Sequence, residues 1–153
     1  MNETTLRPAD VKESEKLLAW RRTVLREVFP DCTEENLNAV IEENRLYYLR
    51  TLPKGDHIAC FACCGEQIIG CGGLCLYSEM PSPDNPNGKC GYLMNIYVLP
   101  KFRRNGTGKK IVEYLVGQAR QQGAGKIYLE AATGTVPFYE SIGFSDMQGY
   151  MKI

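Results

Sequence analysis

One stretch of the chain, residues 90 to 131, constrains the fold more than any other. Residues 90 to 98 are apolar and β-prone, residues 107 to 122 repeat apolar side chains at helical spacing, and residues 126 to 131 are apolar again. A strand, a helix and a strand in this order predict a right-handed parallel crossover. A ligand is then expected at the carboxyl end of the first strand, where the chain turns into the helix.

The turn between that strand and the helix has the composition of an anion site. It reads Arg103-Arg104-Asn105-Gly106-Thr107-Gly108. Glycine has no Cβ, so the backbone can approach a ligand closely, and the first amides of a helix lack an intrahelical acceptor. The helix dipole and the two guanidinium groups add attraction for a diphosphate. We therefore expect this turn to bind phosphate oxygens.

Single residues exclude two other phosphate-binding motifs. A Walker A loop requires a glycine where Arg103 stands and a serine or threonine where Lys110 stands. A dinucleotide fingerprint requires a third glycine where Ile111 stands. Nucleoside triphosphate and NAD chemistry are therefore not expected.

The remaining pattern, Arg-x-x-Gly-x-Gly after a strand ending in Val-x-Pro, resembles the acyl-CoA pyrophosphate loop of the GNAT superfamily of N-acyltransferases. A second segment, residues 136 to 144, is similar to the superfamily's Leu-Tyr-Glu-x-x-Gly-Phe signature. The resemblance is strong over residues 90 to 153. It implies an α/β (α+β) fold of GNAT type, in which about four helices flank a mixed central sheet of six or seven strands with a splayed parallel strand pair at the cofactor site.

The resemblance also implies roles for individual residues. Acetyl-CoA, the acyl donor, would be bound by Ile96, Tyr97, Val98, Arg103, Arg104, Asn105, Gly106, Thr107 and Gly108. A backbone amide at residues 96 to 98 would also bind the oxyanion. Tyr139 stands where the superfamily has its general acid, and a phenol of pKa about 10 can protonate a thiolate whose thiol has a pKa of about 8.5.

The resemblance assigns no residue of this chain as the general base. Many relatives carry a glutamate on the strand that corresponds to residues 90 to 98, but this stretch has no acidic residue. Glu79, at the mouth of a loop, and Glu130, at the end of a strand, are candidate bases acting through water, although a solvated or ion-paired carboxylate is the simpler interpretation of each. His57, the only histidine, starts a strand outside both motifs, which favours a partly exposed structural role.

The first half of the chain predicts a short strand and two helices. Residues 4 to 7 form the strand, and Asp10 with Glu13 predicts a capping box for a helix whose apolar stripe includes Val28. Thr33 predicts the N-cap of a second helix. In the resembling superfamily these two helices flank the acceptor site.

Three residues of the first helix, Trp20, Arg21 and Arg22, could line that acceptor site, although packing and solvated surface are the simpler interpretations. Residues 57 to 64 and 67 to 77 are apolar on both faces, which predicts a central, covered strand hairpin.

Two further segments have weaker signals. Residues 79 to 89 are rich in proline, asparagine and glycine, which predicts an exposed loop. Residues 144 to 153 are expected to return as an antiparallel edge strand.

Composition limits the classes of partner. A chain of 153 residues fits one domain, expected over residues 1–153. Its 18 basic and 18 acidic residues give zero formal charge, which argues against nucleic acid and membrane surfaces. We expect a cytoplasmic protein, because no apolar run approaches a membrane span and no signal peptide is evident. No metal is expected, because Cys60 and Cys63 would point to opposite faces of one strand.

The sequence thus predicts an enzyme, an acetyl-CoA-dependent N-acetyltransferase that moves an acetyl group to a primary amine of a small molecule or peptide by direct transfer. The alternative is a non-catalytic acyl-CoA-binding or sensor domain, which needs no general acid. Glu79 and Asp84 on the loop favour a cationic acceptor. An exposed edge at the carboxyl terminus is compatible with a homodimer.

Overall fold

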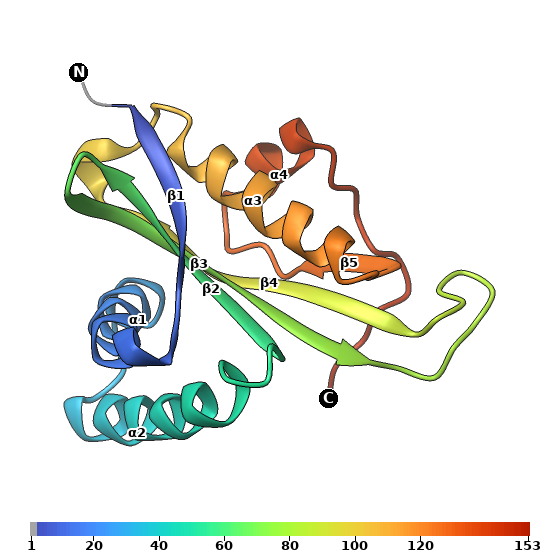
Figure 1. Ribbon diagram of the computed structural model, residues 1–153, viewed down its shortest axis with the longest axis horizontal. Helices are drawn as coiled ribbons and strands as arrows, with labels where there is room; N and C mark the ends of the chain where they lie inside the picture. Colours follow the sequence, from blue (N-terminus) through green and yellow to red (C-terminus); the bar gives the residue numbers. More distant parts are fainter. Residues whose placement is uncertain (1–2) are drawn as a thin grey trace.

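Five strands form one sheet in the order β1-β2-β3-β4-β5 (Figure 1). They are β1 (Thr4–Ala9), β2 (His57–Cys64), β3 (Gln67–Ser78), β4 (Lys89–Val98) and β5 (Lys126–Leu129). Neighbours from β1 to β4 are antiparallel, whereas β4 and β5 run parallel. This computed structural model describes residues 3–153. The mixed sheet confirms the expected fold class, but the described residues form five strands and not six or seven.

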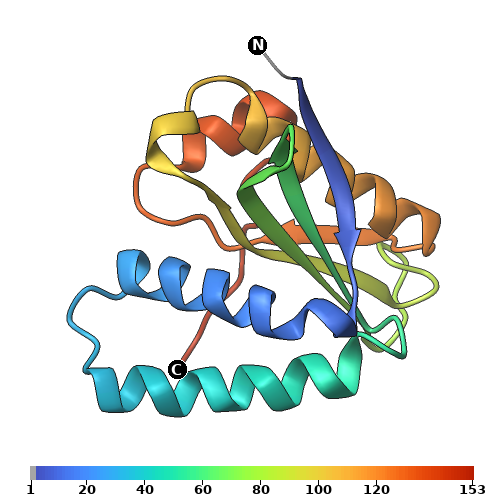
Figure 2. The same ribbon diagram turned by 60° about the vertical axis from the view of Figure 1, so that its left-hand side comes forward.

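Helices cover both faces of the sheet (Figures 1 and 2). One face carries α1 (Ser14–Val28) and α2 (Glu34–Thr51), and the other carries α3 (Thr107–Gln121) and α4 (Val136–Ile142). Two short 3-10 turns, η1 (Val11–Glu13) and η2 (Pro100–Phe102), precede α1 and α3. Each face therefore has its own apolar core, one under α1 and α2 and one under α3.

The predicted helix caps on the first face are only partly right. Thr33 caps α2, because its hydroxyl accepts a hydrogen bond from the amide three residues later at 3.1 Å. Asp10 caps only the η1 turn, and the Glu13 carboxylate binds Arg7 at 2.8 Å instead of completing a capping box. Val28 is 51% exposed at the last turn of α1 and so lies outside the apolar stripe.

The β2–β3 hairpin lies at the centre of the sheet, as predicted. Alternate side chains of β2 face opposite cores, so Cys63 packs under α1 and α2 while Cys60 packs under α3. This confirms that the two thiols cannot share a ligand. Cys71 and Cys90 are also buried, which makes these thiols small apolar packing groups.

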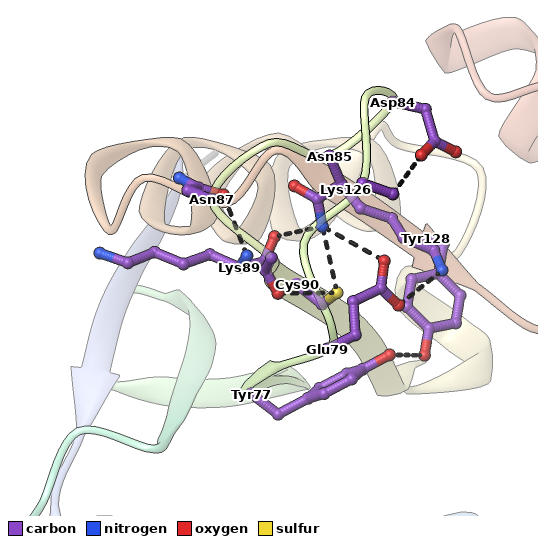
Figure 3. A network of polar contacts seen from close by, with 11 residues as sticks. Tyr77, Glu79, Asp84, Asn85, Asn87, Lys89, Cys90, Lys126 and Tyr128 are labelled. Atoms are coloured by element: carbon purple, nitrogen blue, oxygen red, sulfur yellow. Dashed lines mark hydrogen bonds and ion pairs between the residues drawn. The ribbon is translucent and has the colours of Figure 1, made fainter.

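The loop between β3 and β4 is anchored at one residue. Asn85 is 1% exposed, and its side-chain amide donates to the Glu79 carboxylate at 3.3 Å and to the Lys89 carbonyl at 3.2 Å (Figure 3). The Glu79 carboxylate in turn accepts a hydrogen bond from Lys126 of β5 at 3.1 Å. The prediction of an exposed loop is therefore wrong at Asn85, and the contact between Glu79 and Lys126 ties the loop to β5.

The parallel pair β4–β5 is short. Residues Cys90 to Leu93 of β4 face Lys126 to Leu129 of β5, and the ladder ends there. In the next part of β4 the register with β3 shifts by one residue, and Asn95 has a φ of 60°. This bulge lies where β4 leaves its parallel neighbour, so no strand within residues 3–153 pairs with residues 94 to 98 on that side.

The segment after α4 forms no strand, which corrects the prediction of an edge strand at residues 144 to 153. Gly149 has a φ of 86°, which interrupts the extended backbone that strand pairing needs. Figures 1 and 2 show this segment passing the edge of β5 and ending on the α1–α2 side of the sheet.

Candidate active site

The turn before α3 leaves a row of backbone amides without acceptors. The Lys110 amide donates to the Gly106 carbonyl at 3.1 Å, whereas no described protein atom accepts from the amides of residues 104 to 109. Gly106 has a φ of 81° and Arg104 a φ of 66°, so the backbone is left-handed at both positions. Free amides at a helix N-terminus, together with the helix dipole, can bind phosphate oxygens.

The two arginines of this turn are placed differently. The Arg103 side chain donates from Nε to the Val98 carbonyl at 2.8 Å, and its Nη2 lies 3.1 Å from the Glu27 carboxylate of α1. Its charge is therefore partly balanced within the protein. Arg104 is exposed, and no carboxylate of residues 3–153 pairs with it. Thr107, next along the turn, is buried at 2% exposure.

Gly108 allows α4 to approach the start of α3. A Cβ at Gly108 would lie 3.2 Å from the Phe138 ring, which is tighter than an ordinary contact. Phe138 and Tyr139 are neighbours on α4, with ring centroids 5.0 Å apart. Close packing at Gly108 thus helps to hold Tyr139 near the turn before α3.

Tyr139 lines a cavity of about 1130 Å³ between α3, β5, α4 and the segment after α4. The Tyr139 hydroxyl has no hydrogen-bond partner among the described residues, and burial raises the pKa of this phenol. Its ring packs against Phe144 at 5.9 Å. A half-buried phenol that stays protonated and has a free hydroxyl can donate a proton inside the cavity.

The unpaired part of β4 carries Ile96, Tyr97 and Val98. Because β5 ends opposite Leu93, polar backbone groups on this side of β4 can bind a ligand. The Tyr97 ring is fixed by the Arg103 guanidinium at 5.2 Å and by the Trp20 ring at 6.2 Å. This strand segment therefore adjoins the turn before α3 and is held in place by Trp20 of α1 and by Arg103, which follows η2.

A second, smaller pocket of about 180 Å³ lies on the opposite face of the sheet. Its lining residues come from α1, α2, β2, β3 and β4: Arg21, Asn44, Tyr47, Tyr48, His57, Cys75, Met94 and Asn95. We call it the Arg21 pocket. Of the helix residues considered from sequence, Arg21 lines it, Trp20 packs in the core beside Phe61, and Arg22 pairs with Glu34.

His57 is buried at 5% exposure, so the expectation of a partly exposed histidine is wrong. Burial, and then the charge of Arg21, lowers its pKa to about 4. The Tyr47 hydroxyl lies 2.9 Å from Nδ1 of His57, and burial raises the pKa of that phenol. The pocket therefore holds a neutral imidazole beside a neutral phenol. This pocket was not predicted from the sequence, and Asn95, the only side-chain amide within residues 90 to 98, is the signal that could have indicated it.

The two candidate bases lie apart. Glu130 lines the large cavity with Tyr139. Glu79 lines neither cavity, and the hydrogen bond from Lys126 lowers the pKa of its carboxyl group. Asp84 binds Ser82, which lowers the pKa of that carboxyl group too. Figure 3 shows Glu79 within the polar network that anchors the loop.

Comparison with known proteins agrees with this geometry. The sequence profile of the acetyltransferase (GNAT) family matches residues 15–144. The chain belongs to the GNAT acetyltransferase family. Glucosamine 6-phosphate N-acetyltransferase of Arabidopsis thaliana is 34% identical over 59 residues, which are 39% of this chain and 40% of that protein. A ribosomal-protein-alanine N-acetyltransferase of Escherichia coli is 32% identical over 57 residues, 35% of this chain and 38% of that protein.

The match thus spans about 40% of the length of these curated GNAT relatives. A crystal structure of a predicted acetyltransferase from Clostridium acetobutylicum with acetyl-CoA has the same fold, with a TM-score of 0.85 and 24% identity over 99% of this chain and 96% of that one. Within residues 3–153, no helix is long and apolar enough to cross a bilayer. No three His, Cys, Asp or Glu side chains of those residues gather as a metal site would require.

Proposed function

We propose that this protein is an N-acetyltransferase that transfers the acetyl group of acetyl-CoA directly to a primary amine of a small molecule or peptide. The observation that carries the proposal is the row of unbonded amides at residues 104 to 109, next to the segment of β4 at residues 94 to 98 that is unpaired on its β5 side. GNAT membership and the names of the matched relatives support the same reaction.

In this proposal the turn binds the diphosphate of acetyl-CoA mainly through its backbone. The amides of Arg104 to Gly108 and the α3 dipole supply the attraction, and the exposed Arg104 adds charge. Arg103 contributes by fixing the turn, since it bonds Val98 and Glu27. The pantetheine arm then follows the free side of β4 at Ile96 to Val98, where backbone groups replace the missing strand.

The chemical step follows from this placement. The amine nitrogen attacks the thioester carbon, and the developing oxyanion is bound by a backbone amide of residues 96 to 98. When the C–S bond breaks, the Tyr139 hydroxyl gives its proton to the leaving thiolate, and the proton that the attacking nitrogen loses returns to the tyrosinate through water. The raised pKa of Tyr139 keeps that proton available at neutral pH.

The acceptor must lose a proton before it attacks. For an amine of pKa about 10.4, forming the neutral species at pH 7 costs about 4–5 kcal/mol. Glu130 is the better placed of the two candidate bases, because it lines the cavity that contains Tyr139, whereas Glu79 is engaged by Lys126. A homodimer and a cytoplasmic location stay predictions.

Coenzyme binding is tested with two matched glycine variants. Gly106 and Gly55 have φ values of 81° and 75°, and a Cβ at either would meet nothing within 4 Å. Alanine at either position therefore costs about 1–2 kcal/mol of backbone strain and no clash. Calorimetry should show at least tenfold weaker coenzyme A binding for Gly106→Ala and unchanged binding for Gly55→Ala. Equal affinity in both variants would refute the assignment of this turn.

Catalysis is tested by the release of free thiol from acetyl-CoA with a panel of primary amines. Loss of a general acid typically costs 10²–10⁴-fold, so Tyr139→Phe should lower kcat by about that factor with coenzyme A affinity retained. Tyr114→Phe, on the half-buried face of α3, serves as the control. If no amine releases thiol although coenzyme A binds, the chain is an acyl-CoA-binding or sensor domain.

A further inference from the structure

The Arg21 pocket contains a positive charge and no negative one. Its lining comprises one arginine, one histidine and neutral side chains, with no aspartate or glutamate. Its lining includes residues of α1 and α2. These two helices cover the sheet face opposite α3 (Figure 2). The pocket reaches Asn95, the bulged residue that immediately precedes Ile96 on β4. It is thus next to the strand segment assigned to the thioester.

The Arg21 guanidinium is oriented by neutral oxygens only. Its Nε donates to Asn44 Oδ1 at 3.1 Å and its Nη1 donates to Asn95 Oδ1 at 3.0 Å. The Asn44 amide nitrogen donates to the Val40 carbonyl at 2.8 Å, which turns its oxygen toward Arg21. A guanidinium has five N–H donors, so Arg21 retains donors for a ligand.

Three of the other four arginines on the helices of this face, Arg22, Arg26 and Arg45, are balanced by carboxylates. The fourth, Arg50, is exposed and lies over the Tyr47 ring. Arg26 lies 3.0 Å from Glu34, and Arg45 pairs with Glu42 at 3.3 Å. Arg21 is half-buried, yet no carboxylate of residues 3–153 lies within ion-pair distance of it. A partly desolvated guanidinium with spare donors is a binding group for carboxylate or phosphate.

The neighbours of Arg21 do not supply the missing negative charge. Burial keeps His57, Tyr47 and Cys75 neutral at physiological pH: it lowers the pKa of the histidine and raises the pKa of the phenol and the thiol. The charge of Arg21 lowers the pKa of His57 further. The positive charge of Arg21 would also lower the pKa of an amine bound nearby and so favour the reactive, neutral form of that amine.

We propose that the acetyl acceptor carries an anionic group, a carboxylate or a phosphate, that binds Arg21 while the amine of the acceptor faces β4 beside Asn95. This inference rests on the proposed acetyl transfer and specifies its substrate class. It replaces the argument for a cationic acceptor, because the loop carboxylates that suggested one, Glu79 and Asp84, are engaged by Lys126 and Ser82.

The wild-type protein tests this with matched amines in the thiol-release assay. Alanine is compared with alaninamide for the carboxylate, and glucosamine 6-phosphate with glucosamine for the phosphate. The anionic member of at least one pair should have a kcat/KM at least tenfold higher, and that pair identifies the group. Thiol release without preference for either anionic member overturns this inference and leaves the proposed function intact. If coenzyme A binds but no amine releases thiol, the proposed function fails first.

Variants of Arg21 test whether this residue causes the preference. Hydrogen bonds from a guanidinium to an anionic substrate stabilise the bound substrate, so Arg21→Met should lower kcat/KM for the anionic member at least tenfold, mainly by raising KM. The kcat/KM of the neutral member should not change. Arg21→Lys should restore part of the loss, and Arg26→Met, on the exposed side of α1, should behave as wild type. Equal losses for both members of a pair would show that Arg21 only supports Asn44 and Asn95. Coenzyme A affinity, measured by calorimetry, monitors folding.

Discussion

The burial of His57 predicts an unusual dependence of stability on pH. His57 packs against Tyr47 and Tyr48 of α2, lies 3.6 Å from Cys75 of β3, and is near the Arg21 charge. None of these neighbours carries a negative charge that would balance an imidazolium. The pKa of His57 is therefore lowered to about 4 in the folded protein, while in the unfolded chain it takes its ordinary value of about 6.5.

Proton binding sets the direction in which the free energy of unfolding changes with pH. Below pH 6.5 the unfolded chain binds a proton at His57 and the folded protein does not, so acidification favours unfolding until the folded protein also binds the proton near pH 4. For these two pKa values, the free energy of unfolding should be about 2 kcal/mol lower at pH 5 than at pH 8. In a chain of this length that difference lowers Tm by about 4–8 °C.

Few other side chains titrate between pH 5 and pH 8, so the change in stability over this range can be assigned to His57. His57 is the only histidine, and most carboxyl groups titrate below pH 5. Urea unfolding at pH 8, 7, 6 and 5 should show the decline in wild type, and His57→Gln should remove most of it. A decline of the same size in His57→Gln would refute the assignment, because some other group would then be responsible.

Two further predictions concern packing and the loop. A Cβ at Gly72 would lie 2.6 Å from Ile111 and 2.9 Å from Leu115. Gly72→Ala should therefore lower the free energy of unfolding, measured in urea, by about 1–3 kcal/mol. An unchanged free energy of unfolding would contradict the close approach of α3 to β3. The hydrogen bond from Lys126 lowers the pKa of Glu79 in the folded protein. The stability that this pair supplies is therefore fully present above a pH of about 4.3, the pKa of a glutamate in the unfolded chain. It is lost as the pH falls through the lower pKa that Glu79 has in the folded protein. Glu79→Gln should therefore have a lower Tm than wild type at pH 7 and the same Tm once Glu79 is protonated, and a difference that persists in acid would contradict the ion pair.

The parts of the fold that could be predicted from sequence are those fixed by local patterns. The apolar spacing of residues 107 to 122 predicted α3, which spans Thr107–Gln121. The order of strand, helix and strand predicted the parallel pair of β4 and β5. In both cases the signal lies within about 40 residues and follows from side-chain period and chain handedness.

Side-chain partners could not be predicted, because they come from distant segments. The carboxylate that pairs with Arg103 belongs to Glu27, 76 residues earlier in the chain. Asn85 is buried only because Glu79, Lys89 and β5 surround it. His57 follows the same logic, since tyrosines of α2 cover it. Composition alone assigns such polar residues to the surface, which is their commonest location.

The Glu27–Arg103 pair also shows how the two sides of the site are connected. Glu27 and Arg21 are on the same helix, and they bind opposite ends of one strand segment: Arg21 donates to Asn95, while Glu27 holds Arg103, which donates to the carbonyl of Val98. Helix α1 is thus fastened to β4 on both sides of residues 96 and 97. A coenzyme bound at the turn and an acceptor bound at Arg21 would therefore meet across a short piece of backbone whose position is set by α1. Attack of an amine on a thioester requires the two reacting groups to be held in such a fixed relative position.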